Sequence, residues 1–147
     1  MKSVYKLAAD GYRGLTIVEE YVNSSGIDRG LLELVRIRAS QINACAVCTD
    51  MHSRKAQSEG MSDERLWSVA AWRDTPYFSD SERAALALTE AITRIADDSA
   101  GVADETWADA AAQFPDDELA ALVTAIASVN AWNRINVATR LTAGSFR

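Results

Sequence analysis

The sequence is poor in the residues that most often hold metals: it has two cysteines, Cys45 and Cys48, and a single histidine, His52. A closed structural zinc site needs four ligands, and these three side chains leave it one short. Glu33 would have to be the fourth ligand, which gives a possible but uncommon set. A zinc-binding module, or a purely structural helical module with two cysteines packed as small apolar residues, is therefore an alternative to redox chemistry.

Clusters of basic residues and long apolar runs are also missing. The formal net charge is −6 at pH 7, whereas a nucleic-acid-binding surface needs a basic patch. The longest apolar stretch, residues 119–132, is interrupted by polar side chains and is shorter than the roughly 20 residues of a membrane span. Asp10 interrupts the N-terminal segment too early for a secretory signal. We therefore predict a cytoplasmic protein without nucleic-acid or membrane partners.

No stretch has the alternating, β-branched pattern of a strand, and helix signals recur instead. Asp28 can cap a helix, Ser79 and Glu82 form an S-x-x-E capping box, and Pro115 suits a helix start. The expected helices cover residues 5–23, 28–42, 45–59, 62–72, 79–96, 104 onward and 115–141. A chain of this length fits one domain. We predict an all-α, single-domain helical bundle of about seven helices over residues 1–147.

The core motif of this domain is residues 33–52, which hold every cysteine and histidine of the chain. Cys45, Cys48 and His52 fall within an arc of about 60° on one helical face. If Cys45 lies in the first turn, unpaired N–H groups and the imidazole can lower a thiol pKa from about 8.5 to about 3.5–7.5. Closely spaced cysteines in a cytoplasmic chain are more often redox-active or metal-binding than structural. This arrangement is suited to reversible disulfide chemistry.

Glu33 lies inside a segment that is apolar nearly all round, so we expect it to be buried. A buried carboxylate must find a partner or stay protonated. Arg36, three residues on, and His52 are the two candidates. His52 follows Cys48 by four residues, so the two side chains can meet across a turn, whereas Cys45 lies closer to the positive end of the helix.

Asn133 interrupts an apolar stripe of the last expected helix, and Asn130 flanks it. A buried amide must be hydrogen-bonded. It can cap the end of a neighbouring helix or line a polar site, and the first role is favoured.

The pattern E-x11-C-x-x-C-x3-H is formed by Glu33, Cys45, Cys48 and His52 and is flanked by the sequence INAC at residues 42–45. It resembles the signature of the carboxymuconolactone decarboxylase superfamily. Within it, the chain is most similar to the alkylhydroperoxidase D (AhpD) core-domain branch. Residues 70–93 and 130–140 resemble the same branch, so the likeness covers roughly residues 5–140. One departure is Val47, because the best-known hydroperoxidases have histidine directly before the second cysteine.

The resemblance implies an all-helical fold that assembles into homo-oligomers, as dimers, trimers or hexamers. It also implies a thiol-dependent alkyl hydroperoxide reductase of antioxidant defence, with Cys48 as the peroxidatic thiol and Cys45 as the resolving thiol. His52 and Glu33 would form the proton relay that activates Cys48. The expected partners are a small-molecule hydroperoxide and a thiol or dithiol reductant, or a peroxiredoxin-type redox protein.

No cofactor besides the external dithiol is implied by the resemblance. A decarboxylase activity is suggested only by the name of the superfamily. Such enzymes do not need a C-x-x-C pair, so Cys45 and Cys48 count against it.

Overall fold

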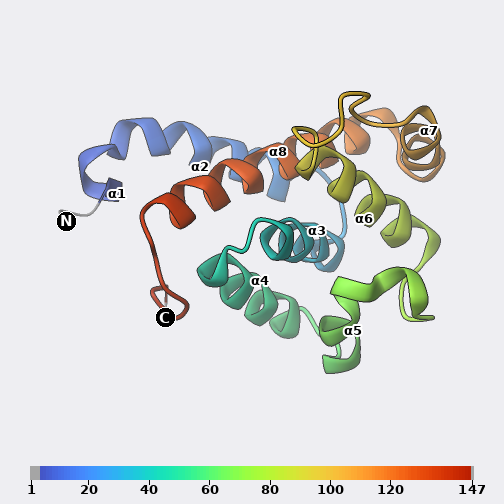
Figure 1. The fold of residues 1–147 in the computed structure, drawn as a ribbon, viewed down its shortest axis with the longest axis horizontal. Helices are drawn as coiled ribbons and strands as arrows, with labels where there is room; N and C mark the ends of the chain where they lie inside the picture. Colours follow the sequence, from blue (N-terminus) through green and yellow to red (C-terminus); the bar gives the residue numbers. More distant parts are fainter. Residues whose placement is uncertain (1–3, 147) are drawn as a thin grey trace.

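Helices are the only regular secondary structure in the computed structural model, which describes residues 4–146 (Figure 1). They are α1 (Val4–Leu7), α2 (Ala9–Asn23), α3 (Arg29–Ile42), α4 (Ala46–Ser58), α5 (Asp63–Ser68), the 3₁₀ helix η1 (Val69–Asp74), α6 (Asp80–Thr93), α7 (Asp104–Gln113) and α8 (Asp116–Ala138). The all-α prediction is confirmed. Within the described range, no helix is both long enough and apolar enough to cross a membrane.

The helix starts follow the capping signals of the sequence. The Asp28 side chain accepts a hydrogen bond from the backbone N–H of Leu31 at 2.9 Å. Ser79 and Glu82 form the expected capping box, in which each side chain binds the backbone N–H of the other residue. These side chains satisfy N–H groups that have no partner inside a helix.

Four helix boundaries differ from the prediction. Helix α6 ends at Thr93 instead of residue 96. The expected helix over residues 5–23 is divided at Ala8 into α1 and α2, although hydrogen bonds continue across the division. The helix expected over 62–72 tightens into η1 after Ser68. Helix α8 ends at Ala138 instead of residue 141, because Arg140 adopts a left-handed backbone with φ 55°.

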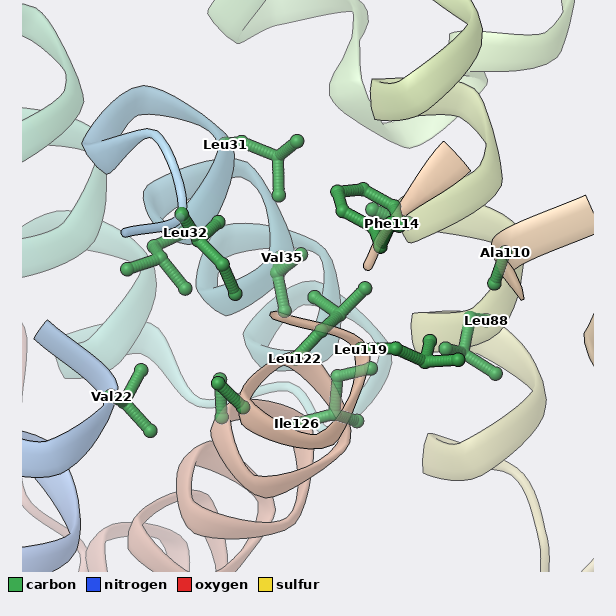
Figure 2. Close-up of a cluster of buried hydrophobic side chains, with 14 residues drawn as sticks. Val22, Leu31, Leu32, Val35, Leu88, Ala110, Phe114, Leu119, Leu122 and Ile126 are labelled. Atoms are coloured by element: carbon green, nitrogen blue, oxygen red, sulfur yellow. The ribbon is translucent and has the colours of Figure 1, made fainter. Parts of the chain in front are cut away.

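Helix α3 lies at the centre of the bundle, between α4 on one side and α8 on the other (Figure 1). Nine of its fourteen residues are buried, as its apolar sequence predicts. Figure 2 shows Leu32 and Val35 of α3 near Leu122 and Ile126 of α8, in the larger apolar cluster. Burial of such side chains contributes roughly 1.5–3 kcal/mol each, which makes α3 the element on which the other helices pack.

A tight turn joins α3 to α4 and carries Cys45. Ala44 adopts a left-handed backbone with φ 53°, and the N–H of Cys45 donates to the carbonyl of Ser40 at 2.9 Å. This pattern is a Schellman motif, which closes the end of α3. Cys45 is consequently the N-cap residue of α4, with extended φ −85° and ψ 92°, and the expectation that it lies in the first turn is wrong.

Asparagines of α8 hold this turn in place. The Asn43 side chain, at the C-cap of α3, donates to the side-chain oxygens of Asn130 and Asn133 at 2.9 Å each. Asn133, which is fully buried, donates in turn to the Ser40 hydroxyl at 3.0 Å. Both partners of Asn133 are side chains at the end of α3, so Asn133 binds that helix end but does not satisfy its backbone groups as a cap would, and the favoured capping role is not confirmed. Helix α8 therefore positions the turn that leads into the cysteines.

The left-handed backbone of Ala44 generates a stability prediction. Glycine adopts this conformation without the contact between Cβ and backbone that disfavours it for alanine. We expect Ala44→Gly to raise the free energy of unfolding by about 1 kcal/mol. In contrast, Ala120→Gly, at an exposed position inside α8, should lower it by about 1 kcal/mol. Urea denaturation of both variants checks the pair, and a loss of stability in Ala44→Gly would contradict it.

Candidate active site

Cys45 and Cys48 form a disulfide, with their Cα atoms 5.4 Å apart. Cys48 lies in the first turn of α4 and Cys45 immediately precedes that helix. Both residues are only 1% exposed, and they pack with Val47 and Leu141. The spacing of the C-x-x-C motif at the helix start therefore allows the two sulfurs to bond.

The structure brings Glu33 and His52 into direct contact. Oε2 of Glu33 lies 2.7 Å from Nδ1 of His52, and both residues are buried. They come from α3 and α4, which pack against each other. Both partners that the sequence suggested for Glu33 are used, because its Oε1 also accepts from Nη1 of Arg36 at 2.7 Å.

These contacts make Glu33 a carboxylate at neutral pH. Burial by itself raises the pKa of Glu33, but the hydrogen bond and charge of His52 and those of Arg36 oppose it, and the pKa is lowered overall. An ionised carboxylate can only accept, so Nδ1 of His52 carries the hydrogen that they share. The other ring nitrogen, Nε2, is then left to accept a proton.

Arg36 extends this set of charges to a third helix. Its Nη2 donates to Oε2 of Glu19 at 2.8 Å and to the side-chain oxygen of Asn23 at 2.9 Å, both on α2. Glu19 in turn accepts from the Ser128 hydroxyl of α8 at 2.5 Å. Sequence reasoning did not select Glu19, because nothing in the local pattern of α2 indicates that its carboxylate faces Arg36.

Cys48 and His52 line the same cavity, which has a volume of about 260 Å³. Glu19 and Arg36 contribute its charged side chains. Most of the remaining wall is apolar or aromatic and comes from both ends of the described chain and from α4 and α8: Tyr5, Met51, Val129, Trp132 and Phe146. Cys45 does not line this cavity but a separate one, so the two cysteines border different cavities.

Asn136 contacts the sulfur of Cys48 and was not identified from the sequence. Its Nδ2 donates to Sγ of Cys48 at 3.2 Å, and its Oδ1 accepts from the Tyr5 hydroxyl. The hydrogen bond from Tyr5 orients the amide so that its N–H faces the sulfur. The recurrence of asparagine at positions 130, 133 and 136 within an apolar helix is a signal that could have revealed it.

A metal cluster is not formed at these residues. Within residues 4–146, no group of three or more histidine, cysteine, aspartate and glutamate side chains is arranged to hold a metal ion. Nδ1 of His52 is occupied by Glu33, and the cysteines are bonded to each other.

Comparison with known proteins places this geometry in a family. Residues 9–91, more than half of the chain, match the carboxymuconolactone decarboxylase family. The chain belongs to this family. The matched residues run from α2 into α6 and include Glu33, Cys45, Cys48 and His52.

The resemblance to the AhpD branch of the family is also confirmed. The chain is 37% identical to the uncharacterized protein YdfG of Bacillus subtilis, over 92% of this chain and 91% of that protein. It is 39% identical to the alkyl hydroperoxide reductase AhpD of Corynebacterium kroppenstedtii, over 33% of this chain and 28% of that protein.

A solved structure has the same fold over nearly its whole length. The protein ATU0492 of Agrobacterium tumefaciens, of unknown function and provisionally described as an antioxidant defence protein AhpD, superposes with a TM-score of 0.89. The two chains are 33% identical, and the match covers 96% of this chain and 95% of that one. The predicted AhpD-like helical bundle is thereby confirmed.

The lowered pKa of Glu33 predicts a loss of stability in acid. The folded state holds the Glu33 proton less readily than the unfolded chain, whose pKa is near the ordinary 4.5. The contribution of Glu33 to the free energy of unfolding is therefore complete above pH 4.5 and is lost as pH falls through the lower folded pKa. We expect Glu33→Gln to reduce the free energy of unfolding by about 3 kcal/mol at pH 7, and by progressively less below pH 4.5.

Urea denaturation of the wild type and the variant at several pH values measures this difference. Glu59→Gln is the control, because Glu59 and Arg29 form a longer and more exposed ion pair of 3.9 Å. We expect the control to change the stability by no more than about 0.5 kcal/mol. A difference between wild type and Glu33→Gln that does not shrink in acid would contradict the prediction.

Proposed function

We propose that this protein is a thiol-dependent reductase of alkyl hydroperoxides, with Cys48 as the peroxidatic and Cys45 as the resolving cysteine. One observation carries the proposal: Cys48 shares a cavity with His52, while Cys45 lines a separate cavity and is bonded to Cys48. Family membership and the similarity to an alkyl hydroperoxide reductase add support.

Activation of Cys48 follows from the contacts around it. With its Nδ1–H held by Glu33, His52 can accept the thiol proton at Nε2. The N–H group of Asn136, 3.2 Å from the sulfur, can stabilise the resulting thiolate. Asn136 is thus a candidate positioning residue that the family pattern alone did not indicate. No histidine precedes Cys48, because Val47 occupies that position, so Cys45 has no second imidazole beside it.

The proposed reaction transfers two electrons from sulfur to the peroxide. The Cys48 thiolate attacks the terminal oxygen of the hydroperoxide, an S–O bond forms, and the O–O bond breaks. The electron pair of that bond leaves on the alkoxide, which takes a proton from His52 and departs as the alcohol. Cys48 is left as a sulfenic acid.

The second cysteine then closes the cycle. The Cys45 sulfur displaces water from the sulfenic acid, which yields the disulfide that the structure contains. An external dithiol returns two electrons and two protons, and no resident cofactor takes part. The predicted cytoplasmic location would supply such thiols. That location, a peroxiredoxin-type partner and assembly into homo-oligomers all remain predictions.

The first test assigns the two cysteines. In reduced protein, we expect Cys48→Ser to lower hydroperoxide consumption by about 100-fold or more, since it removes the nucleophile. Cys45→Ser should retain a single turnover and accumulate a sulfenic acid on Cys48, which dimedone labelling and mass spectrometry detect. Unchanged turnover in Cys48→Ser would refute the proposed function. Sulfenic acid on Cys45 of Cys48→Ser, formed at the wild-type rate, would reverse the assignment.

The lining of the cavity predicts a preference for organic hydroperoxides. Tyr5 and Trp132 stack with their planes 10° apart, and both line the cavity next to Cys48. We expect Trp132→Ala to raise the KM for cumene hydroperoxide by about tenfold, because apolar contact with the substrate is lost. The KM for hydrogen peroxide, which has no apolar group, should change little.

Steady-state kinetics with both peroxides measures this difference. Trp107→Ala is the matched control, because Trp107 lies on α7, is 47% exposed and does not line the cavity. An equal change in KM for the two peroxides in Trp132→Ala would contradict a role in substrate recognition.

A further inference from the structure

A second cavity, of about 290 Å³, lies on the Cys45 side of the disulfide. The α3–α4 turn forms one wall, and the end of α8 with the segment after it forms the other. Its lining comprises Ala44, Cys45, Ala46, Asn136, Val137, Arg140, Leu141, Thr142 and Ala143. Asn136 lines both cavities, so it forms part of the wall between them. The two cysteines therefore border different cavities.

Arg140 gives this second cavity its charge. It is the only ionisable side chain among the described residues that line the cavity, apart from the disulfide itself. Its guanidinium has no hydrogen bond or ion pair within residues 4–146, whereas Arg36 and Arg38 are both paired with carboxylates. A cation without a protein partner at the edge of a cavity favours a ligand with an anionic group.

The backbone at Arg140 makes an arginine there unexpected. Its N–H donates to the carbonyl of Val137 at 3.1 Å, and the N–H of Leu141 donates to that of Asn136 at 3.0 Å. With φ 55° at Arg140, this is a second Schellman motif, at the position where glycine is normally preferred. The local backbone thus does not account for arginine at this position.

The chemistry of disulfide reduction favours attack on Cys45. A thiolate attacks one sulfur from the side opposite the bond that breaks, and the sulfur that leaves more easily is the one better stabilised as a thiolate. Asn136 donates to Sγ of Cys48 at 3.2 Å, and His52 lines the same cavity. Cys48 is therefore the better leaving group, so the reductant should approach Cys45, which lines the second cavity.

We propose that the second cavity is the binding site of the reductant, and that this reductant is a thiol carrying a carboxylate, which Arg140 binds. The proposal rests on the proposed function, because it names the molecule class that resets the cysteine pair. Peroxide then meets the reduced Cys48 in the first cavity, and the reductant meets the disulfide at Cys45 in the second cavity. Neither has to leave before the other binds.

The thiol–disulfide exchange takes place in two steps. A thiolate of the reductant forms a bond to Sγ of Cys45, the Cys45–Cys48 bond breaks, and its electron pair leaves on Cys48 as the thiolate. A second thiolate of the reductant then attacks the reductant sulfur of this mixed disulfide and releases Cys45. The two protons lost by the reductant end on the protein thiols, and the reductant departs as its own disulfide.

The first experiment identifies the attacked sulfur. Oxidised wild-type protein is mixed with 3-mercaptopropionate, quenched in acid after a short time, and the freed thiol is alkylated. Cys45 and Cys48 lie on one tryptic peptide, residues 39–54, and tandem mass spectrometry locates each group on it. We expect mercaptopropionate on Cys45 and the alkyl group on Cys48. The reverse pattern would overturn the proposal.

The second experiment tests the charge. Rate constants for disulfide reduction are measured with 3-mercaptopropionate and with neutral 2-mercaptoethanol, and their ratio removes the effect of general changes in reactivity. We expect Arg140→Gly, which suits the left-handed backbone, to lower this ratio by about fivefold, and Arg140→Lys to keep most of it. Arg29→Ala, at the end of α3 that is far from the Cys45 turn, should leave the ratio unchanged.

An unchanged ratio in Arg140→Gly would overturn the carboxylate preference. Neither experiment contains a peroxide, so its outcome is separate from that of the proposed function. If both thiols reduce Arg140→Gly at the wild-type rates but peroxide consumption still depends on Cys48, only the reductant site is wrong. If peroxide is not consumed but the ratio falls as expected, the proposed peroxidase activity is wrong, and thiol exchange at Cys45 stands.

Discussion

The buried carboxylate of Glu33 is the constraint on which the rest of the structure depends. A charge in the middle of the central helix is tolerated only because both of its oxygens have partners, at 2.7 Å from His52 and 2.7 Å from Arg36. Arg36 must then be neutralised too, which brings in Glu19 of α2. Three helices are thus tied together by the need to pair charges out of water. The same pairing orients the imidazole toward the cavity that Cys48 lines.

The turn between α3 and α4 is the second fixed point of the site. Its backbone is closed by the bond from Cys45 to Ser40, and its position is set by the amide of Asn43 held between two asparagines of α8. Helix α8 also supplies Asn136, which contacts Cys48 and separates two cavities. One helix therefore positions the cysteine pair and also divides the space around it. The two cysteines consequently border different cavities.

Local signals in the sequence were sufficient for much of the fold. Asp28 and the Ser79–Glu82 box mark helix starts, because capping depends on residues within one turn. The burial of Glu33 and its two candidate partners, Arg36 and His52, were also predicted from periodicity and spacing. The placement of Cys45 in the first helical turn was wrong, since its N–H is taken by the preceding helix. Residues 44 and 140 have left-handed backbones but are alanine and arginine, so no glycine in the sequence predicted these conformations.

The sequence by itself determined the helical class, the C-x-x-C pair with its histidine, and the need for Glu33 to be paired, because each depends on residue type and short-range spacing. Only the tertiary structure decided which cysteine borders which cavity, and that Tyr5, Asn136 and Arg140 line these cavities. The physical reason is distance along the chain: Tyr5 and Asn136 are 131 positions apart, and their contact arises only when α2, α3 and α8 pack into one core. No local pattern encodes such a contact.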